Sequence, residues 1–376
     1  VWDGGTTVAN GQGALDLGFG ADFDFAIVPD PESPPQGLLT QPGGLGDLVI
    51  NITGDDEDSD SEDDSDDGSG GQGTDGDSAE DEDGTANDGD DANNTEPASD
   101  GADDTEGGSL RLHYVDEGPR DAPAVLMLHG NPTWSFYYRN LVLALRDRYR
   151  CIVPDHIGFG RSDKPVAIGD YSYQRHVDWV RVFIEALDLR DITLVCQDWG
   201  SLIGLRLAAE HPERFARISV GNGALPTATA ALKIPLAFKL WRAYAVHTPW
   251  FPVGRIVSAL CSSRPGAAIR AAYDAPFPDE SYKAGARAFP RLVPTEASDP
   301  AIPANRAAWA ALGGYTRPFL TYFGKQDPIL GRGDGPLQRH IPGAAGQPHQ
   351  RVRGSHFLQE DAGAQWAQAV VDWMRG

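Results

Sequence analysis

From about residue 109 onward, short apolar runs alternate with segments whose apolar residues recur at helical spacing. The short runs predict buried strands, because a strand covered on both faces is apolar throughout. They lie at 110–115, 124–128, 150–154, 191–197, 217–221, 318–323 and about 349–353. The helical segments lie at 136–146, 172–187, 200–210, about 335–340 and 362–374. This alternation predicts an α/β fold with a mostly parallel central sheet and helices on both faces.

The alternation stops near Gly223 and does not resume until after residue 305. Residues 224–305 are rich in Ala, Pro and aromatic residues and show no clear strand pattern. An insertion of this kind predicts a helical cap over the carboxyl edge of the sheet, where open α/β sheets bind ligands. We therefore expect a core made of 109–223 and 306–376, with the cap 224–305 inserted after the predicted strand at 217–221.

Residues 1–108 differ in composition from the rest of the chain. They hold 31 of the 55 Asp and Glu residues and none of the 31 Lys and Arg residues. Between 55 and 106 there are almost no apolar residues, so burial cannot offset the entropy of ordering, and like charges repel. We predict a low-complexity, acidic, disordered N-terminal segment. Calcium binding at fragments such as 75–77 is the alternative, although these do not follow the twelve-residue calcium-loop pattern.

The remainder of the chain limits the class of protein. Its 31 basic residues are scattered rather than clustered, which argues against nucleic-acid binding. No apolar run reaches the roughly 20 residues that a membrane-spanning helix needs. Cys151, Cys196 and Cys261 lack metal-ligand spacing, and the first two lie in apolar runs that predict buried free thiols. This favours a reducing, cytoplasmic compartment, with a periplasmic or secreted location as the alternative.

The strongest chemical signal is the segment 194–200, which reads LVCQDWG. An apolar strand runs into a tight turn flanked by small residues, and a helix follows, which is the pattern of a nucleophile elbow. The helix N-terminus favours an anion, so Asp198 is expected to stay ionised. A carboxylate in this place suits displacement at a saturated carbon and formation of an alkyl-enzyme ester. The alternative is an Asp that only caps the following helix.

Three further segments each follow a predicted strand. In the loop 129–134, Asn131 stands where this fold supplies one backbone N–H of an oxyanion hole, and Trp199 is placed to supply the other. The segment 322–328 ends a late predicted strand with Asp327, which suits the acid that orients a histidine. The segment 354–357 follows the next predicted strand and holds His356, which suits the general base. The order nucleophile, acid, histidine is that of the α/β-hydrolases.

Over residues 110–375 the chain resembles the haloalkane dehalogenases of the α/β-hydrolase fold. The resemblance rests on the segments 129–135, 158–165, 194–200 and 275–282 and on those around Asp327 and His356. It implies hydrolysis of carbon–halogen bonds in small haloalkanes through an ester on Asp198, giving a primary alcohol, halide and a proton. The expected partners are thus a small haloalkane and water, with no metal or cofactor, and we expect a monomer.

The cap segment is most similar to the subfamily that holds halide between two tryptophans. By this resemblance, the indole N–H of Trp199 is one halide donor and a cap tryptophan is the second. Trp241 is the best match, and Trp250 is a weaker one. An indole N–H suits an anion because the ring carries no acceptor that would repel it. Asn131 could also donate through its side-chain amide, so the second donor is Trp241, Asn131 or both.

Two other functions remain open from the sequence. An epoxide hydrolase would share the Asp nucleophile but would need cap tyrosines to protonate the epoxide oxygen, and Tyr244, Tyr273 and Tyr282 are present. The residues Asn-Pro-Thr-Trp at 131–134 and the cap tryptophan favour dehalogenation. A catalytically inert, hydrolase-like binding protein is the other alternative. The complete set of nucleophile, acid and histidine argues against it.

Overall fold

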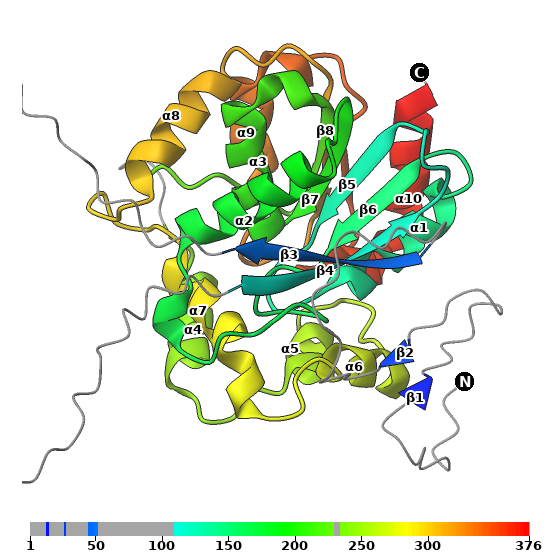
Figure 1. Cartoon of the computed structure of the whole chain (residues 1–376). Helices are drawn as coiled ribbons and strands as arrows, with labels where there is room; N and C mark the ends of the chain where they lie inside the picture. Colours follow the sequence, from blue (N-terminus) through cyan, green and yellow to red (C-terminus); the bar gives the residue numbers. More distant parts are fainter. Residues whose placement is uncertain (1–12, 15–25, 28–43, 52–108, 229–233, 376) are drawn as a thin grey trace, which may run out of the picture. The chain divides into compact units, whose positions relative to one another are not determined.

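The computed structural model describes residues 13–14, 26–27, 44–51, 109–228 and 234–375. Its central sheet has eight strands in the order β10-β9-β8-β7-β5-β6-β4-β3 (Figure 1). All pairings from β10 to β6 are parallel, and β4 pairs antiparallel with β6. The strands are β3 Gly44–Asn51, β4 Ser109–Glu117, β5 Ala124–Leu128, β6 Arg150–Pro154, β7 Ile192–Gln197, β8 Phe215–Gly221, β9 Phe319–Gly324 and β10 Gln350–Val352. The predicted α/β fold with a mostly parallel sheet is confirmed.

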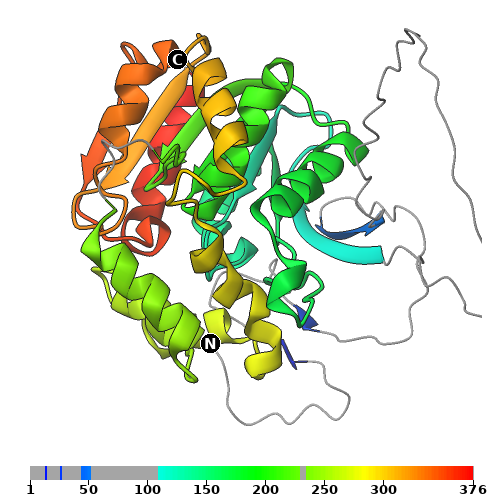
Figure 2. The ribbon, with the colours of Figure 1, turned by 90° about the vertical axis from the view of Figure 1, so that its left-hand side faces the viewer.

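Helices cover both faces of this sheet (Figures 1 and 2). On one face α3 packs against β5 and β7 and also contacts α2 and α8. On the other face α1 and α10 pack together, with α1 against β6 and α10 against β9. The helices of the core are α1 Arg139–Leu145, α2 Tyr173–Ala186, α3 Trp199–Glu210, α9 Asp334–His340 and α10 Leu358–Arg375. A helix was predicted from the sequence at each of these five places.

The segment between β8 and β9 is helical where the structure describes it. Its helices are α4 Leu236–His247, α5 Val253–Ala259, α6 Ala267–Asp274, α7 Ala284–Leu292 and α8 Ile302–Leu312. Helix α4 packs against α7, and α5 packs against α6, whereas α8 packs on α3 of the core. Helix α8 therefore crosses the boundary expected at 305. The exact division into core and cap stays a prediction, because the whole chain from 109 onward belongs to a single compact unit.

The strand β3 was not predicted. It lies next to β4 in the sheet, yet it falls within 1–108, for which we expected disorder. For these eight residues the expectation is wrong. Ile50 is buried and Leu48 packs against the core. The strand pairs with the edge of β4, and the local sequence of β3 does not reveal this distant backbone partner. A separate pair of short strands, β1 Gly13–Ala14 and β2 Ala26–Ile27, is antiparallel. The acidic tract 55–106 and its calcium alternative lie outside the described residues.

Cys151, Cys196 and Cys261 are all free and buried, which confirms the prediction for the first two. Among the described helices, none combines the length and the apolar character needed to cross a membrane.

Candidate active site

Asp198 occupies the sharp turn between β7 and α3. Its backbone has φ 51° and ψ −124°, a region that costs a non-glycine residue about 1–3 kcal/mol. The turn is held on both sides: the N–H of Asp198 donates to the carbonyl of Asn222 at 3.1 Å, and its carbonyl accepts from the hydroxyl of Ser201 at 2.6 Å. The carboxylate makes no capping bond to α3. Helix capping is therefore not what holds this Asp in place.

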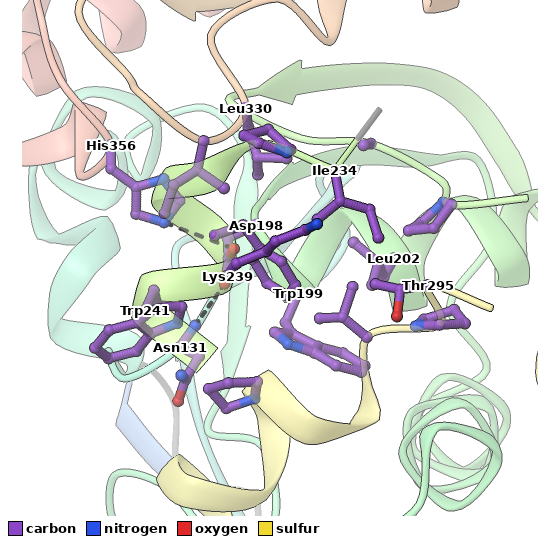
Figure 3. Close-up of a pocket in the computed structure, with 18 of the residues that line it drawn as sticks. Asn131, Asp198, Trp199, Leu202, Ile234, Lys239, Trp241, Thr295, Leu330 and His356 are labelled. Atoms are coloured by element: carbon purple, nitrogen blue, oxygen red, sulfur yellow. Dashed lines mark hydrogen bonds and ion pairs between the residues drawn. The ribbon is translucent and has the colours of Figure 1, made fainter. Parts of the chain in front are cut away.

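Two glycines let the backbone approach this carboxylate closely. A Cβ atom on Gly130 would lie 2.4 Å from Cβ of Asp198, and one on Gly200 would lie 1.9 Å from the carbonyl oxygen of Leu128. Because both positions lack a side chain, the loop after β5 comes within reach of the elbow. The backbone N–H of Asn131 donates to Oδ1 of Asp198 at 2.8 Å (Figure 3). The elbow and the loop that were predicted to form an oxyanion hole thus lie together.

The imidazole of His356 lies between two carboxylates. Its Nδ1 is 3.0 Å from Oδ2 of Asp327, and its Nε2 is 3.6 Å from Oδ2 of Asp198. The other oxygen of Asp327 accepts from the N–H groups of Ile329 at 2.7 Å and Leu330 at 3.0 Å, which fixes the orientation of that carboxylate. The three residues predicted to act together are therefore brought together, in the order that the sequence indicated.

Burial and charge shift the pKa values of all three groups. Burial raises the pKa of Asp198, while His356 and the N–H groups of Asn131 and Trp199 act in the opposite direction. Burial alone would lower the pKa of His356, but the charge of Asp327, their hydrogen bond and the charge of Asp198 outweigh it and raise this pKa to about 9. Burial also opposes ionisation of Asp327, but His356 and the backbone donors hold its pKa below the ordinary value. The net effect is a raised pKa for Asp198 and for His356 and a lowered pKa for Asp327.

Asn222 supports the site and was missed from the sequence. Its Nδ2 donates to the carbonyls of Ser355 at 2.7 Å and His356 at 3.1 Å, and its Oδ1 accepts from the N–H of Gly324 at 2.7 Å. It therefore connects the end of β8 to the end of β9 and to the loop that carries His356. The sequence signal that could have indicated it is an Asn directly after a predicted buried strand, at the sheet edge where the other site residues lie. In the structure, Asn222 has a φ of 38°.

Asp198 and His356 open into a cavity of about 490 Å³. Trp199, Asn131 and, from α4, Trp241 also line it (Figure 3). Within the described residues, neither the Nδ2 nor the Oδ1 atom of Asn131 has a hydrogen-bond partner, although both atoms are buried. Side chains with N–H groups that could bind an anion thus line the cavity next to the nucleophile: Asn131 and Trp199 from the core, and Trp241 from the cap.

Trp250, the weaker sequence match for a halide donor, is 58% exposed and is not part of the cavity lining. Trp241 is half-buried and packs against the ring of Phe251 at 5.7 Å. Between these two cap tryptophans, the geometry favours Trp241.

The three cap tyrosines do not line the cavity. The hydroxyl of Tyr244 donates to the carbonyl of Trp250 at 2.8 Å, and that of Tyr273 donates to the carboxylate of Glu360. Tyr282 is 42% exposed. The described lining therefore offers no tyrosine to protonate an epoxide oxygen, which argues against the epoxide hydrolase alternative. In the same part of the chain, no cluster of three or more His, Cys, Asp or Glu side chains could hold a metal ion.

The fold and the site define an α/β hydrolase, and a family model described as "alpha/beta hydrolase fold" matches residues 123–362. Within that class, the chain is 58% identical over 267 residues to the haloalkane dehalogenase of Mycolicibacterium paratuberculosis K-10, covering 71% of this chain and 88% of that protein. The chain belongs to the haloalkane dehalogenases and is a hydrolase.

Other relatives agree with this assignment. Haloalkane dehalogenase of Psychrobacter cryohalolentis K5 is 49% identical over 274 residues, covering 72% of this chain and 90% of that protein. Among solved structures, the tetrameric haloalkane dehalogenase DpaA from Paraglaciecola agarilytica NO2 superimposes with a TM-score of 0.65 at 32% identity. That match covers 71% of this chain and 88% of DpaA.

Proposed function

We propose that the site hydrolyses carbon–halogen bonds in two steps, the first being alkylation of Asp198. Its Oδ2, which lies 3.6 Å from Nε2 of His356, attacks the carbon that bears the halogen. The carbon–oxygen bond forms while the carbon–halogen bond breaks, and the electron pair leaves with the halide. The observation that carries this proposal is the position of one carboxylate, with Oδ1 held by the N–H of Asn131 and Oδ2 facing an imidazole.

In the second step, Nε2 of His356 takes a proton from water, and the resulting hydroxide attacks Cγ of the ester. The negative charge that develops on Oδ1 is stabilised by the backbone N–H groups of Asn131 and Trp199. Collapse of this intermediate expels the alkoxide, which takes the proton from His356 and leaves as the alcohol. The carboxyl group regenerated on Asp198 then loses its proton and is again a carboxylate. Water and haloalkane thus balance to alcohol, halide and a proton, and Asp327 orients the imidazole throughout.

The charge of Asp198 determines that alkylation precedes general-base catalysis by His356. While Asp198 is ionised, its charge contributes to the raised pKa of His356, so the imidazole is protonated and is not a base. Alkylation turns the carboxylate into a neutral ester and removes that contribution. The pKa of His356 then falls, and the imidazole becomes a base once the ester that it must hydrolyse has formed.

We propose that the leaving halide is held by the indole N–H groups of Trp199 and Trp241, with Nδ2 of Asn131 as a further donor. All three residues line the cavity beside Asp198, and the Asn131 amide is otherwise unpaired among the described residues. The apolar bodies of the indoles keep water away and thereby strengthen the contact with the anion.

The proposal is tested by substituting Asp198→Asn and assaying halide release from a small panel of chloro- and bromoalkanes. The wild-type protein should release halide, and Asp198→Asn should stay folded and release none. Asp372→Asn, on the exposed side of α10, is a matched control that should retain full activity. Formation of diols from epoxides without halide release would instead favour the epoxide hydrolase.

A further inference from the structure

The carbonyl oxygen of Gly130 accepts three hydrogen bonds. Thr133 donates its backbone N–H at 3.0 Å and its Oγ1 hydroxyl at 2.9 Å, and Nδ1 of His129 lies at 2.9 Å. This carbonyl belongs to the same peptide group as the N–H of Asn131, which points at Oδ1 of Asp198. Whatever holds and polarises the carbonyl therefore acts on the oxyanion-hole donor at the other end of one rigid peptide plane.

The proton on His129 can be assigned from its surroundings. Nε2 of His129 accepts from the backbone N–H of His156 at 3.0 Å, so in the neutral ring the proton is on Nδ1, where it donates to Gly130. Burial lowers the pKa of His129 to about 4, which keeps the ring in this neutral form. All three interactions with the Gly130 carbonyl are thus donated to it.

We propose that Thr133, together with His129, is a positioning residue of the oxyanion hole, because its hydroxyl orients and polarises the peptide between Gly130 and Asn131. The inference rests on the proposed two-step reaction. Hydrogen bonds to a peptide oxygen strengthen the N–H of that peptide as a donor. A donor that is already fixed in place needs no reorganisation when charge develops opposite it.

The two chemical steps should depend differently on this hydroxyl. During alkylation, negative charge moves from Asp198 to the halide, so the N–H of Asn131 faces a charge that decreases. During ester hydrolysis, charge builds up on Oδ1 and the same N–H faces a charge that increases. A weakened donor should therefore slow hydrolysis of the ester and leave alkylation nearly unchanged. A purely structural defect has no reason to separate the two steps in this way.

The test compares Thr133→Val, which keeps the shape of the buried side chain but lacks the hydroxyl, with Thr133→Ser, which retains the hydroxyl. Rapid-mixing kinetics with a bromoalkane that the wild-type protein turns over would give the rates of bromide release and of ester hydrolysis separately. In Thr133→Val we expect ester hydrolysis to slow by about tenfold, the loss expected for one hydrogen bond, with the alkylation rate within about twofold of wild type. Thr133→Ser should restore the hydrolysis rate.

Equal slowing of both steps, unchanged hydrolysis in Thr133→Val, or failure of Thr133→Ser to restore it would overturn the inference. If Thr133→Val does not fold, Thr133→Cys keeps a side chain of similar size with a much weaker donor, and the same separation of the two rates is expected. Absence of bromide release from the wild-type protein would refute the proposed function itself, and this inference with it. If the wild-type protein releases bromide, the results for the Thr133 variants test the role of Thr133 alone and not the proposed function.

Discussion

Nε2 of His356 lies 3.6 Å from Oδ2 of Asp198, the carboxylate oxygen that the Asn131 N–H does not hold. The two oxygens of this carboxylate therefore have different surroundings. Oδ1 is fixed by a backbone donor, and Oδ2 faces the imidazole. The proposed reaction uses this difference, because Oδ2 forms the bond to carbon and Oδ1 carries the later negative charge.

Removing the proposed base should separate the two steps. In His356→Gln, we expect a burst of one halide per active site and then almost no turnover, since alkylation does not need the imidazole whereas ester hydrolysis does. Loss of a general base slows its step by about 10²- to 10⁴-fold. Mass spectrometry of the intact protein should show the added alkyl group. A variant that turns over repeatedly, or that gives no burst, would contradict the role assigned to His356.

The charge of Asp198 should be visible in the titration of His356. Because Asn is neutral like the ester, the pKa of His356 in Asp198→Asn should lie below the value of about 9 for the wild-type site. An NMR titration of the imidazole signal in both proteins measures this difference. Equal pKa values in the two proteins would mean that alkylation does not turn His356 into a base.

The raised pKa of His356 also predicts how stability depends on pH. An imidazole whose pKa rises from 6.5 to about 9 on folding contributes stability that is fully present below pH 6.5 and is lost as the pH rises through about 9. The difference in unfolding free energy between wild type and His356→Gln should therefore shrink between pH 6.5 and 9.5. Denaturant unfolding at several pH values checks this, and a difference that grows with pH would oppose the assignment.

The two cap tryptophans provide a matched pair for halide binding. Trp241→Phe removes the indole N–H of a ring that lines the cavity, and we expect bromide to bind about tenfold more weakly, as for the loss of one hydrogen bond. Trp250→Phe removes an N–H from an exposed ring outside the cavity and should leave the affinity unchanged. Bromide titrations followed by product inhibition give both values. Unchanged affinity in Trp241→Phe would leave Asn131 as the second donor.

Asp361 joins the loop after α5 to the loop that precedes His356. Its Oδ2 accepts from the N–H groups of Ser262 at 2.9 Å and Ser355 at 2.7 Å, and its Oδ1 accepts from Ser263 at 2.7 Å. In Asp361→Asn, the amide would turn an N–H toward one of these donors. We expect a loss of about 1–3 kcal/mol in unfolding free energy. Denaturant unfolding should show this loss beside an unchanged Asp372→Asn, and equal stability of the two variants would contradict it.

The parts of the site that the sequence predicted share one property: each is determined by neighbours in the chain. The strand, turn and helix around Asp198 and the positions of Asp327 and His356 just after strands follow from local apolar spacing and small residues. The missed features depend on distant partners. β3 needs the edge of β4, and Asn222 acts on carbonyls more than 130 residues away, as the separation to Ser355 shows.

In the cap, too, neighbouring residues in the chain indicate the candidates, whereas contacts with distant residues decide between them. Sequence patterns could name Trp241 and Trp250 as candidates, but only the packing of α4 shows which of them reaches the cavity. The cap tyrosines kept the epoxide hydrolase alternative open for the same reason. The hydroxyls of Tyr244 and Tyr273 are bonded elsewhere, and no local pattern indicates those partners.

A single turnover in ¹⁸O-labelled water tests the central claim most directly. With enzyme in excess over a bromoalkane, hydrolysis of an ester at Cγ of Asp198 places the label in the carboxylate of residue 198. The first alcohol then carries the unlabelled oxygen from the protein. Mass spectrometry of the peptide that contains Asp198 should show a gain of about 2 Da, the mass difference of the label, if the ester forms. Label in the alcohol with none in that peptide would mean that water attacks the haloalkane directly.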